Sequence, residues 1–179
     1  WEGKEVYLGI DLAMTTDNCS VSMVCEEKGI VYAKSWAFIP NDRIDEKTRR
    51  EKVDYRAMIR NGYCFSCGES VVDYLYIEEF IMSLEEKYGV IIMGIGYDRY
   101  NCMSTAQKLD NAGYEVVEIK QHSSVLHSPT KLLEELVLSK MFAYEPNRLL
   151  EINFANARCL YDTNLNRYVN KKKSSGKID

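Results

Sequence analysis

The stretch EVYLGIDL, residues 5–12, is the part of the sequence that decides the fold. Its apolar and β-branched residues are typical of a β-strand, and the strand ends at a single charged residue, Asp11. Two further segments with the same pattern follow, residues 19–25 and 30–39, and a turn at residues 27–29 separates them. Strands connected this closely must pair as an antiparallel meander.

Farther along the chain, helices and strands alternate. Apolar residues at helical spacing between Tyr74 and Tyr88 stop at Gly89, and the near-continuous apolar run Val90–Tyr97 predicts a strand that is buried on both faces. A helix over residues 104–113 and a strand over 115–120 then complete a parallel βαβ unit. The expected fold is an α/β mixed sheet, with three antiparallel strands followed by parallel βα units and helices on both faces. This order is that of RNase H-like proteins.

Three other segments carry structural expectations. The charge-dense segment 40–62 is interpreted as a solvated helix or mobile excursion outside the core. Ser128 and Pro129 are interpreted as the start of a helix, and its core face is formed by Leu132, Leu133, Leu136 and Val137. Residues 162–166 predict a turn between two short extended stretches.

Composition limits the possible functions. A chain of 179 residues, 46% hydrophobic and 28% charged, is expected to form one folded domain. No apolar run approaches the roughly 20 residues of a membrane span, and the first residues do not resemble a secretory signal. We therefore expect a protein that acts inside a cell and is not embedded in a membrane. A net charge of -4 argues against tight non-specific binding of nucleic acid by this domain alone.

The six cysteines are scattered along the chain, which favours free thiols in a reducing compartment over a disulfide scaffold. Cys64 and Cys67 have the spacing of half a zinc site. Because no second pair of cysteines or histidines completes that site, structural thiols are the preferred interpretation.

Two aspartates carry the chemistry. Asp11 ends the first strand, and Asp98 ends the run at residues 91–97, which should lie beside the first strand in such a sheet. Asp11 alone could simply cap a turn. Two carboxylates that converge at one sheet edge repel each other unless a divalent cation neutralises them, and oxygen ligands of this kind favour Mg²⁺ or Mn²⁺.

At this point the sequence resembles a known family. Residues 9–13 with Thr15-Thr16-Asp17, residues 96–98, residues 128–131 with Glu134, and residues 177–179 are similar, in order and spacing, to successive motifs of the nuclease domains of phage terminase large subunits. The resemblance covers nearly the whole chain. It implies an RNase H-like endonuclease that cuts double-stranded viral DNA concatemers during genome packaging in the cytoplasm of the host cell.

The resemblance also implies the site residues. Asp11, Asp98 and Asp179 would be the catalytic metal ligands and would hold two Mg²⁺ or Mn²⁺ ions about 3.5–4 Å apart. Asp17 is either an auxiliary acid or, slightly preferred, a turn residue. The basic tail that contains Lys171, Lys172 and Lys173 would supply DNA contacts and compensate locally for the acidic net charge.

The resemblance further implies an ATPase domain, a small terminase subunit and a portal as partners. No Gly-x-x-x-x-Gly-Lys-Ser/Thr loop occurs in the sequence, so we expect residues 1–179 to be a single nuclease domain without the ATPase domain. With Asp179 as the last residue, we expect the third ligand to be poorly anchored and the site to favour Mn²⁺ over the more demanding Mg²⁺.

Two alternatives stay open. Residues 9–16 also resemble the first phosphate loop of actin and heat-shock-type ATPases, but those proteins need two lobes, and Ala13-Met14 stands where they have glycine. A catalytically inactive RNase H-like docking module is the second alternative. Cleavage of plasmid DNA with Mn²⁺ distinguishes the nuclease from both.

Overall fold

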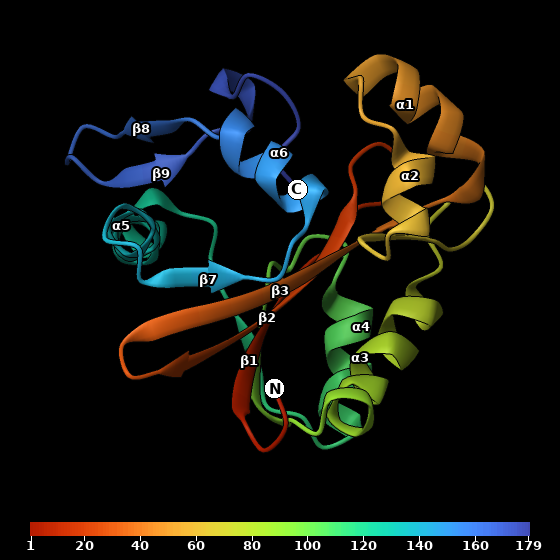
Figure 1. The fold of residues 1–179 in the computed structure, drawn as a ribbon, viewed down its shortest axis with the longest axis horizontal. Helices are drawn as coiled ribbons and strands as arrows, with labels where there is room; N and C mark the ends of the chain where they lie inside the picture. Colours follow the sequence, from red (N-terminus) through yellow and green to blue (C-terminus); the bar gives the residue numbers. More distant parts are fainter.

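The computed structural model describes residues 1–179 and is built around a seven-stranded mixed sheet (Figure 1). Six strands lie in the order β4-β3-β2-β1-β5-β6, and β7 pairs with β3 off this path. Their bounds are β1 Glu5–Asp11, β2 Cys19–Glu27, β3 Ile30–Ile39, β4 Cys64–Ser66, β5 Ile91–Tyr97, β6 Val116–Glu118 and β7 Phe142–Tyr144.

The predicted mixed sheet is confirmed. Strands β1, β2 and β3 form an antiparallel meander, whereas β5 pairs parallel to β1 and β6 pairs parallel to β5. The short strand β4, which was not predicted, adds parallel to β3. The strand that begins the chain and the strand that ends at Tyr97 are therefore neighbours at the centre of the sheet, as expected.

Two helices, α3 (Tyr74–Tyr88) and α4 (Met103–Asn111), cover one face of the sheet. The side chain of Asp73 caps the first turn of α3, and Gly89 ends that helix in the left-handed conformation that glycine adopts without strain. Ile77, Ile81 and Leu84 of α3 are fully buried in the main core. The helical pattern of this segment thus identified both the helix and its buried face.

The remaining elements lie on the other side of the sheet or beyond its edge (Figure 1). They are α5 (Ser123–Leu138), α6 (Arg148–Asn156), a separate hairpin formed by β8 (Cys159–Tyr161) and β9 (Arg167–Val169), and the short 3-10 helix η2 (Lys171–Lys173). Backbone N–H groups of Asn164 and Asn166 donate to Asp162, so the turn predicted at residues 162–166 is confirmed. No helix has the length and the apolar character needed to cross a membrane.

The predicted start and core face of α5 are wrong. The helix begins at Ser123, capped by His122, and Pro129 lies inside it. No residue of α5 is buried; Leu132 is 56% exposed. The helix packs mainly along β9, through contacts such as the ion pair between Arg167 and Glu134, and only slightly against β7 of the sheet, so no residue of its apolar stripe is buried.

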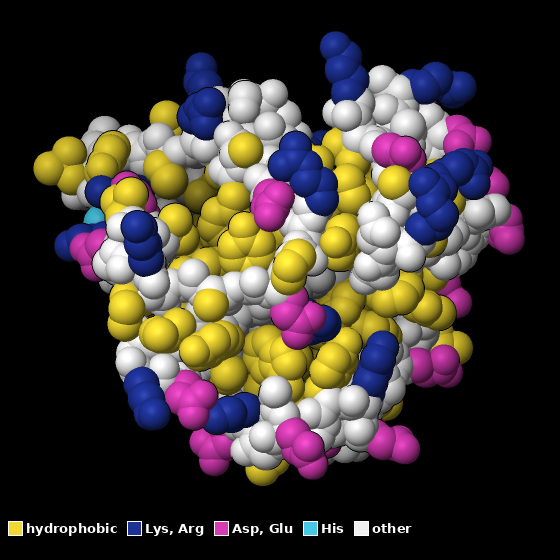
Figure 2. Space-filling model, in the orientation of Figure 1, with side chains coloured by type: hydrophobic (Ala, Val, Ile, Leu, Met, Phe, Trp, Pro, Cys, Tyr) yellow, Lys and Arg dark blue, Asp and Glu magenta, His cyan; other side chains and the backbone are white.

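Because α5 does not cover the sheet, β5 is not buried on both faces. Ile91 and Met93 are exposed, because they point to the face that α3 and α4 do not cover. Figure 2 shows apolar side chains gathered across the middle of the visible surface. A continuous apolar run therefore identified the strand correctly, although it did not determine which layers cover that strand.

Segment 40–62 is packed and not peripheral, which corrects the sequence-based interpretation. It forms the 3-10 helix η1 (Asn41–Arg43) and the helices α1 (Ile44–Glu51) and α2 (Tyr55–Arg60). Tyr55 is completely buried in a second apolar cluster with Ile39 of β3 and Leu149 of α6, and even Lys47 is only 1% exposed. Several of its charges form ion pairs within the segment, such as Lys47 with Glu51 and Arg56 with Asp45, which composition alone does not reveal.

All six cysteines are free thiols. Cys64 and Cys67 are buried, and burial raises the pKa of Cys64 to about 12 and the pKa of Cys67 to about 11. Both side chains belong to the apolar packing around β4 and β3. This environment suits structural thiols, which remain protonated and unreactive at neutral pH.

Candidate metal centre

The register of the central strands brings Asp11 and Asp98 to neighbouring strand ends. Ile10 of β1 is paired with Tyr97 of β5 in the parallel ladder, so the next residues along the two strands are Asp11 and Asp98. The Asp98 carboxylate accepts a hydrogen bond from the backbone N–H of Tyr100 at 3.2 Å, which holds the turn that follows β5. Both carboxylates line the same cleft, whose volume is about 980 Å³.

The cleft combines acidic residues with one lysine. Asp17 and Lys171 line it together with Asp11 and Asp98, and its far wall comes from α5 and the β8-β9 hairpin, including His122, Asp162 and Tyr168. The sheet, the loop after β1 and the segment after β9 thus meet at one place. A cleft of this size and polar lining can admit a charged backbone.

Asp179 lies beside this cleft and not in it. It lines a separate small cavity with Asn18 and Ser20, and Ser20 is the residue paired with Asp11 across β1 and β2. The carboxylate of Asp179 is close enough to raise the pKa of Asp11. The structure therefore places the third predicted ligand next to the first, with a different immediate environment.

The expectation that Asp179 is poorly anchored is wrong. Its side chain is only 3% exposed, and its backbone N–H donates to Oδ1 of Asn153 in α6 at 2.6 Å. The amide of Asn156 donates to the carbonyl of Lys177 at 3.0 Å. These contacts tie residues 177–179 to α6, and the predicted preference for Mn²⁺ over Mg²⁺ loses its structural basis.

Asp17 is held by two lysines from the tail. Lys177 donates to Asp17 Oδ1, and Lys171 Nζ lies 3.6 Å from Asp17 Oδ2. Burial alone would raise the pKa of Asp17, but the hydrogen bond from Lys177 and the charge of Lys171 hold it below its ordinary value. Asp17 is therefore an ionised group in the cleft as well as a residue of the loop after β1.

The electrostatics around Asp11 are those of crowded carboxylates. Burial raises the pKa of Asp11; Lys171 opposes the shift, while Asp179, Asp98 and Asp17 reinforce it. Burial also raises the pKa of Asp179, against the opposing charges of Lys171 and Lys177. Neighbouring carboxylates that raise the pKa of Asp11 in this way favour a bound cation.

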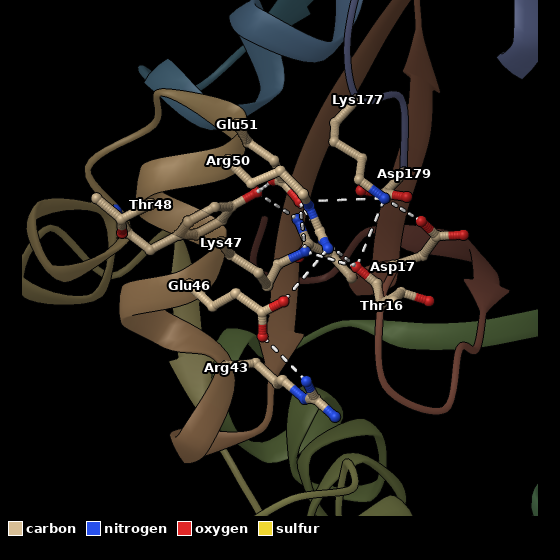
Figure 3. Close-up of polar contacts among 12 residues, drawn as sticks. Thr16, Asp17, Arg43, Glu46, Lys47, Thr48, Arg50, Glu51, Lys177 and Asp179 are labelled. Atoms are coloured by element: carbon tan, nitrogen blue, oxygen red, sulfur yellow. Dashed lines mark hydrogen bonds and ion pairs between the residues drawn. The ribbon is translucent and has the colours of Figure 1, made fainter.

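A buried network fixes the loop that carries Asp17 (Figure 3). Lys47 of α1 donates to the carbonyl of Thr16 at 2.8 Å and pairs with Glu51 at 2.9 Å. The hydroxyl of Tyr55 donates to the same Glu51 and accepts from Asn18 at 3.1 Å. Lys47 of α1 therefore holds Thr16, and Tyr55 of α2 holds Asn18, so the two helices together clamp both ends of the short stretch from Thr16 to Asn18.

The residues present fit a divalent cation in charge and in donor chemistry. The cleft offers carboxylate oxygens, Asp179 Oδ2 is buried without a hydrogen-bond partner, and the Lys171 ammonium already stands between Asp17 and Asp179 as a cation. However, no group of three or more His, Cys, Asp or Glu side chains is close enough together to surround one ion. The acids are thus gathered but spaced more widely than a shared ion needs.

The three lysines predicted to contact DNA differ from one another. Lys171 Nζ lies 3.4 Å from Asp179 Oδ1 and faces the acids, whereas Lys172 and Lys173 are exposed on the 3-10 helix η2. Sequence reasoning also missed Asn153, Lys47 and Glu51, because a polar residue on a helix gives no sign of a distant partner, such as Asp179 for Asn153 or Thr16 for Lys47.

Comparison with known proteins gives a consistent picture. The family model described as terminase large subunit, endonuclease domain, matches residues 1–179. The large terminase subunit of Enterobacteria phage HK97 is 23% identical over 179 residues, which is 98% of this chain and 35% of that protein. The chain thus spans about a third of the length of this curated relative.

Solved structures share the fold. The crystal structure of the HK97 large terminase matches with a TM-score of 0.88 at 21% identity, over 98% of this chain and 37% of that one. The large terminase nuclease of thermophilic phage G20c matches with a TM-score of 0.54 at 14% identity, over 97% of this chain and 74% of that one. A structure of the G20c nuclease with bound magnesium matches with a TM-score of 0.56 at 14% identity, covering 93% of this chain and 71% of that one.

Proposed function

Because this chain belongs to the family of terminase large subunit endonuclease domains, we propose that it is a metal-dependent endodeoxyribonuclease that cuts double-stranded viral DNA concatemers during genome packaging. The observation that carries the proposal is the pairing of Ile10 with Tyr97, which brings Asp11 and Asp98 together at the edge of one cleft. Metal-dependent phosphodiester hydrolysis uses convergent acids of this kind, since they can hold cations against a phosphate.

Asp11, Asp98 and Asp179 would hold two ions, Mg²⁺ or Mn²⁺, with Asp17 as an auxiliary acid. Magnesium bound to the related G20c nuclease supports this donor chemistry. When bound, such ions would neutralise charge on the scissile phosphate and lower the pKa of a water molecule. The chain's own contribution is to orient the carboxylates through the β1-β5 register, the clamp formed by α1 and α2, and the contacts to α6.

Lys172 and Lys173, which are exposed and follow the cleft residue Lys171 in η2, would attract the phosphate backbone. Contacts of this kind carry no sequence information, so we expect endonuclease activity with little preference for sequence. The ATPase domain, the small terminase subunit and the portal would be the partners, in the cytoplasm of the host cell. The much greater length of the HK97 protein fits an attached motor that keeps the nuclease on DNA despite its net charge of -4.

An inactive docking module on the same fold is the second candidate, since the net charge is acidic and no three acids surround one ion. The actin-type ATPase interpretation loses support, because the nuclease family accounts for residues 1–179 without a phosphate loop. Plasmid cleavage with Mg²⁺ or Mn²⁺ distinguishes the first two. We expect many cut sites and no activity with chelator; a folded chain that leaves plasmid intact under all metal conditions would support the docking module.

A further inference from the structure

Lys171 occupies an unusual place among the acids. Its ammonium lies 3.4 Å from Asp179 Oδ1 and 3.6 Å from Asp17 Oδ2, and its charge is the strongest favourable influence on the ionised form of Asp11. It forms ion pairs with Asp17 and Asp179 and lines the same cleft as Asp11. Among these crowded carboxylates, the ammonium neutralises negative charge, as a bound metal ion would.

The ammonium and a divalent ion cannot share this place. Mg²⁺ takes carboxylate oxygens at about 2.0–2.1 Å, far closer than the oxygens that now surround Lys171. The side chain of Lys171 is 53% exposed and long, so it can swing away without unfolding its surroundings. Its backbone stays fixed, because the side chain of Asn170 accepts a hydrogen bond from Lys173 N–H and caps η2.

We propose that Lys171 is an exchangeable counter-ion of the metal centre: its ammonium holds Asp17 and Asp179 in the absence of metal, and it moves out when a divalent cation binds. This inference rests on the proposed function, since it presumes that the acids bind metal. It explains why the acids are gathered without being close enough to surround one ion. Once the Lys171 ammonium has moved out, the carboxylates move closer together around the divalent cation.

Such exchange lowers the apparent affinity for metal, because only the fraction of molecules with Lys171 displaced can bind. An uncharged residue of similar length removes that competition. We therefore expect Lys171→Met to bind Mn²⁺ more tightly than the unaltered chain, by about tenfold if the displaced arrangement has a population of about 10%. In the metal-free state, the same variant should melt at a lower temperature, because the carboxylates lose their cation.

Calorimetric titration with Mn²⁺, in the absence of DNA, measures this directly, with Lys172→Met as the matched control. Lys172 is the adjacent residue on η2 and is exposed, so its replacement should change Mn²⁺ affinity less than twofold. Unchanged or weaker binding by Lys171→Met would overturn the proposal. Absence of Mn²⁺ binding by the unaltered chain would overturn it together with the metal centre of the proposed function.

A second measurement needs no variant. Acetylation of lysines by a water-soluble ester, followed by mass spectrometry, reports how accessible each amine is. Addition of Mn²⁺ should speed the modification of Lys171 severalfold, while Lys172 and Lys173 keep their rates. Saturable Mn²⁺ binding without any change at Lys171 would leave the metal centre intact and refute the exchange.

Discussion

The two sides of the candidate centre are built in different ways. Asp11 and Asp98 stand at the end of the parallel ladder between β1 and β5, whose register sets their relation. Asp17 and Asp179 stand on a loop and a tail, and side chains hold them: Lys177 and Lys171 from the tail, and Asn153 from α6. One side is fixed by strand register, the other by a network of ion pairs and hydrogen bonds.

This difference predicts different behaviour. The ladder side, Asp11 and Asp98, makes no ion pair with a lysine or arginine, and the paired strands beneath it provide a rigid foundation for any ligand. The network side, Asp17 and Asp179, can rearrange, because the side chain of Lys171 can move away and Asp179 Oδ2 has no hydrogen-bond partner. Chemistry should therefore depend most on the ladder side, whereas stability and metal affinity should respond to the network side.

The largest effect is expected on the ladder side. Asp11→Asn or Asp98→Asn should lower the rate of plasmid cleavage by at least about a thousandfold, or about 4 kcal/mol in the barrier, since an amide is a poor substitute for an ionised ligand. Asp110→Asn, an exposed position at the end of α4, serves as the control and should keep full activity. Circular dichroism should show all three variants folded. Retention of more than a tenth of the activity by either ladder variant would show that the ladder side is not the centre.

The next effect concerns Lys47 and Glu51 of α1, which hold the loop that carries Asp17. Lys47→Met should lower the free energy of unfolding by about 3 kcal/mol, because Glu51 loses its closest and most buried counter-charge and keeps only the Tyr55 hydroxyl and the longer contacts to Arg50 and Lys177. Arg50→Met, which removes a charge that is 45% exposed in the same network, should cost less than about 1 kcal/mol. Urea denaturation measures both. Equal losses for the two variants would show that burial does not govern this network.

A smaller effect is expected from the anchor of the tail. Asn153→Ala removes the acceptor for the Asp179 N–H and should weaken Mn²⁺ binding by about 10–100-fold, which is the usual consequence of losing an outer-shell partner. Asn111→Ala removes an exposed amide on α4 as a control. If titration gives the same Mn²⁺ affinity for both variants, Asp179 is not a ligand.

Substitution of Lys172 should have the smallest effect. Lys172→Met should weaken DNA binding a few-fold for every sequence tested and reduce the slope of log affinity against log salt by about 1, which is the mark of one lost phosphate contact. Fluorescence anisotropy at several salt concentrations measures this. A loss confined to one DNA sequence would be inconsistent with a contact to the backbone.

The ladder side could be predicted from sequence because its information is local. An apolar run that ends in aspartate identifies each strand. The order of strands and helices along the chain then predicts a mixed sheet in which these two strands are neighbours. The network side could not be derived this way, since the contacts of Lys47 with Thr16, Asn153 with Asp179, and Lys171 with Asp17 form only through tertiary packing. Only resemblance to a family pointed to Asp179, and burial of its side chain by the tail contacts was not foreseen.

The error over α5 has the same origin. Its apolar spacing identified a helix correctly. However, periodicity shows only which residues share a face of the helix, and it does not determine which surface that face packs against. The helix lies along β9, and both its stripe and the outer residues of β5 stay exposed. Segment 40–62 shows the converse case, in which a charge-rich composition concealed a buried ion pair and a fully buried tyrosine.

The most direct test of the account is a crystal structure of this chain grown with Mn²⁺, with anomalous scattering used to locate the ions. We predict manganese at the ends of β1 and β5, bound by Asp11 and Asp98, with Asp179 drawn in as a further ligand and the Lys171 ammonium displaced from it. Manganese bound elsewhere, or none between Asp11 and Asp98 at saturating concentration, would contradict the central claim.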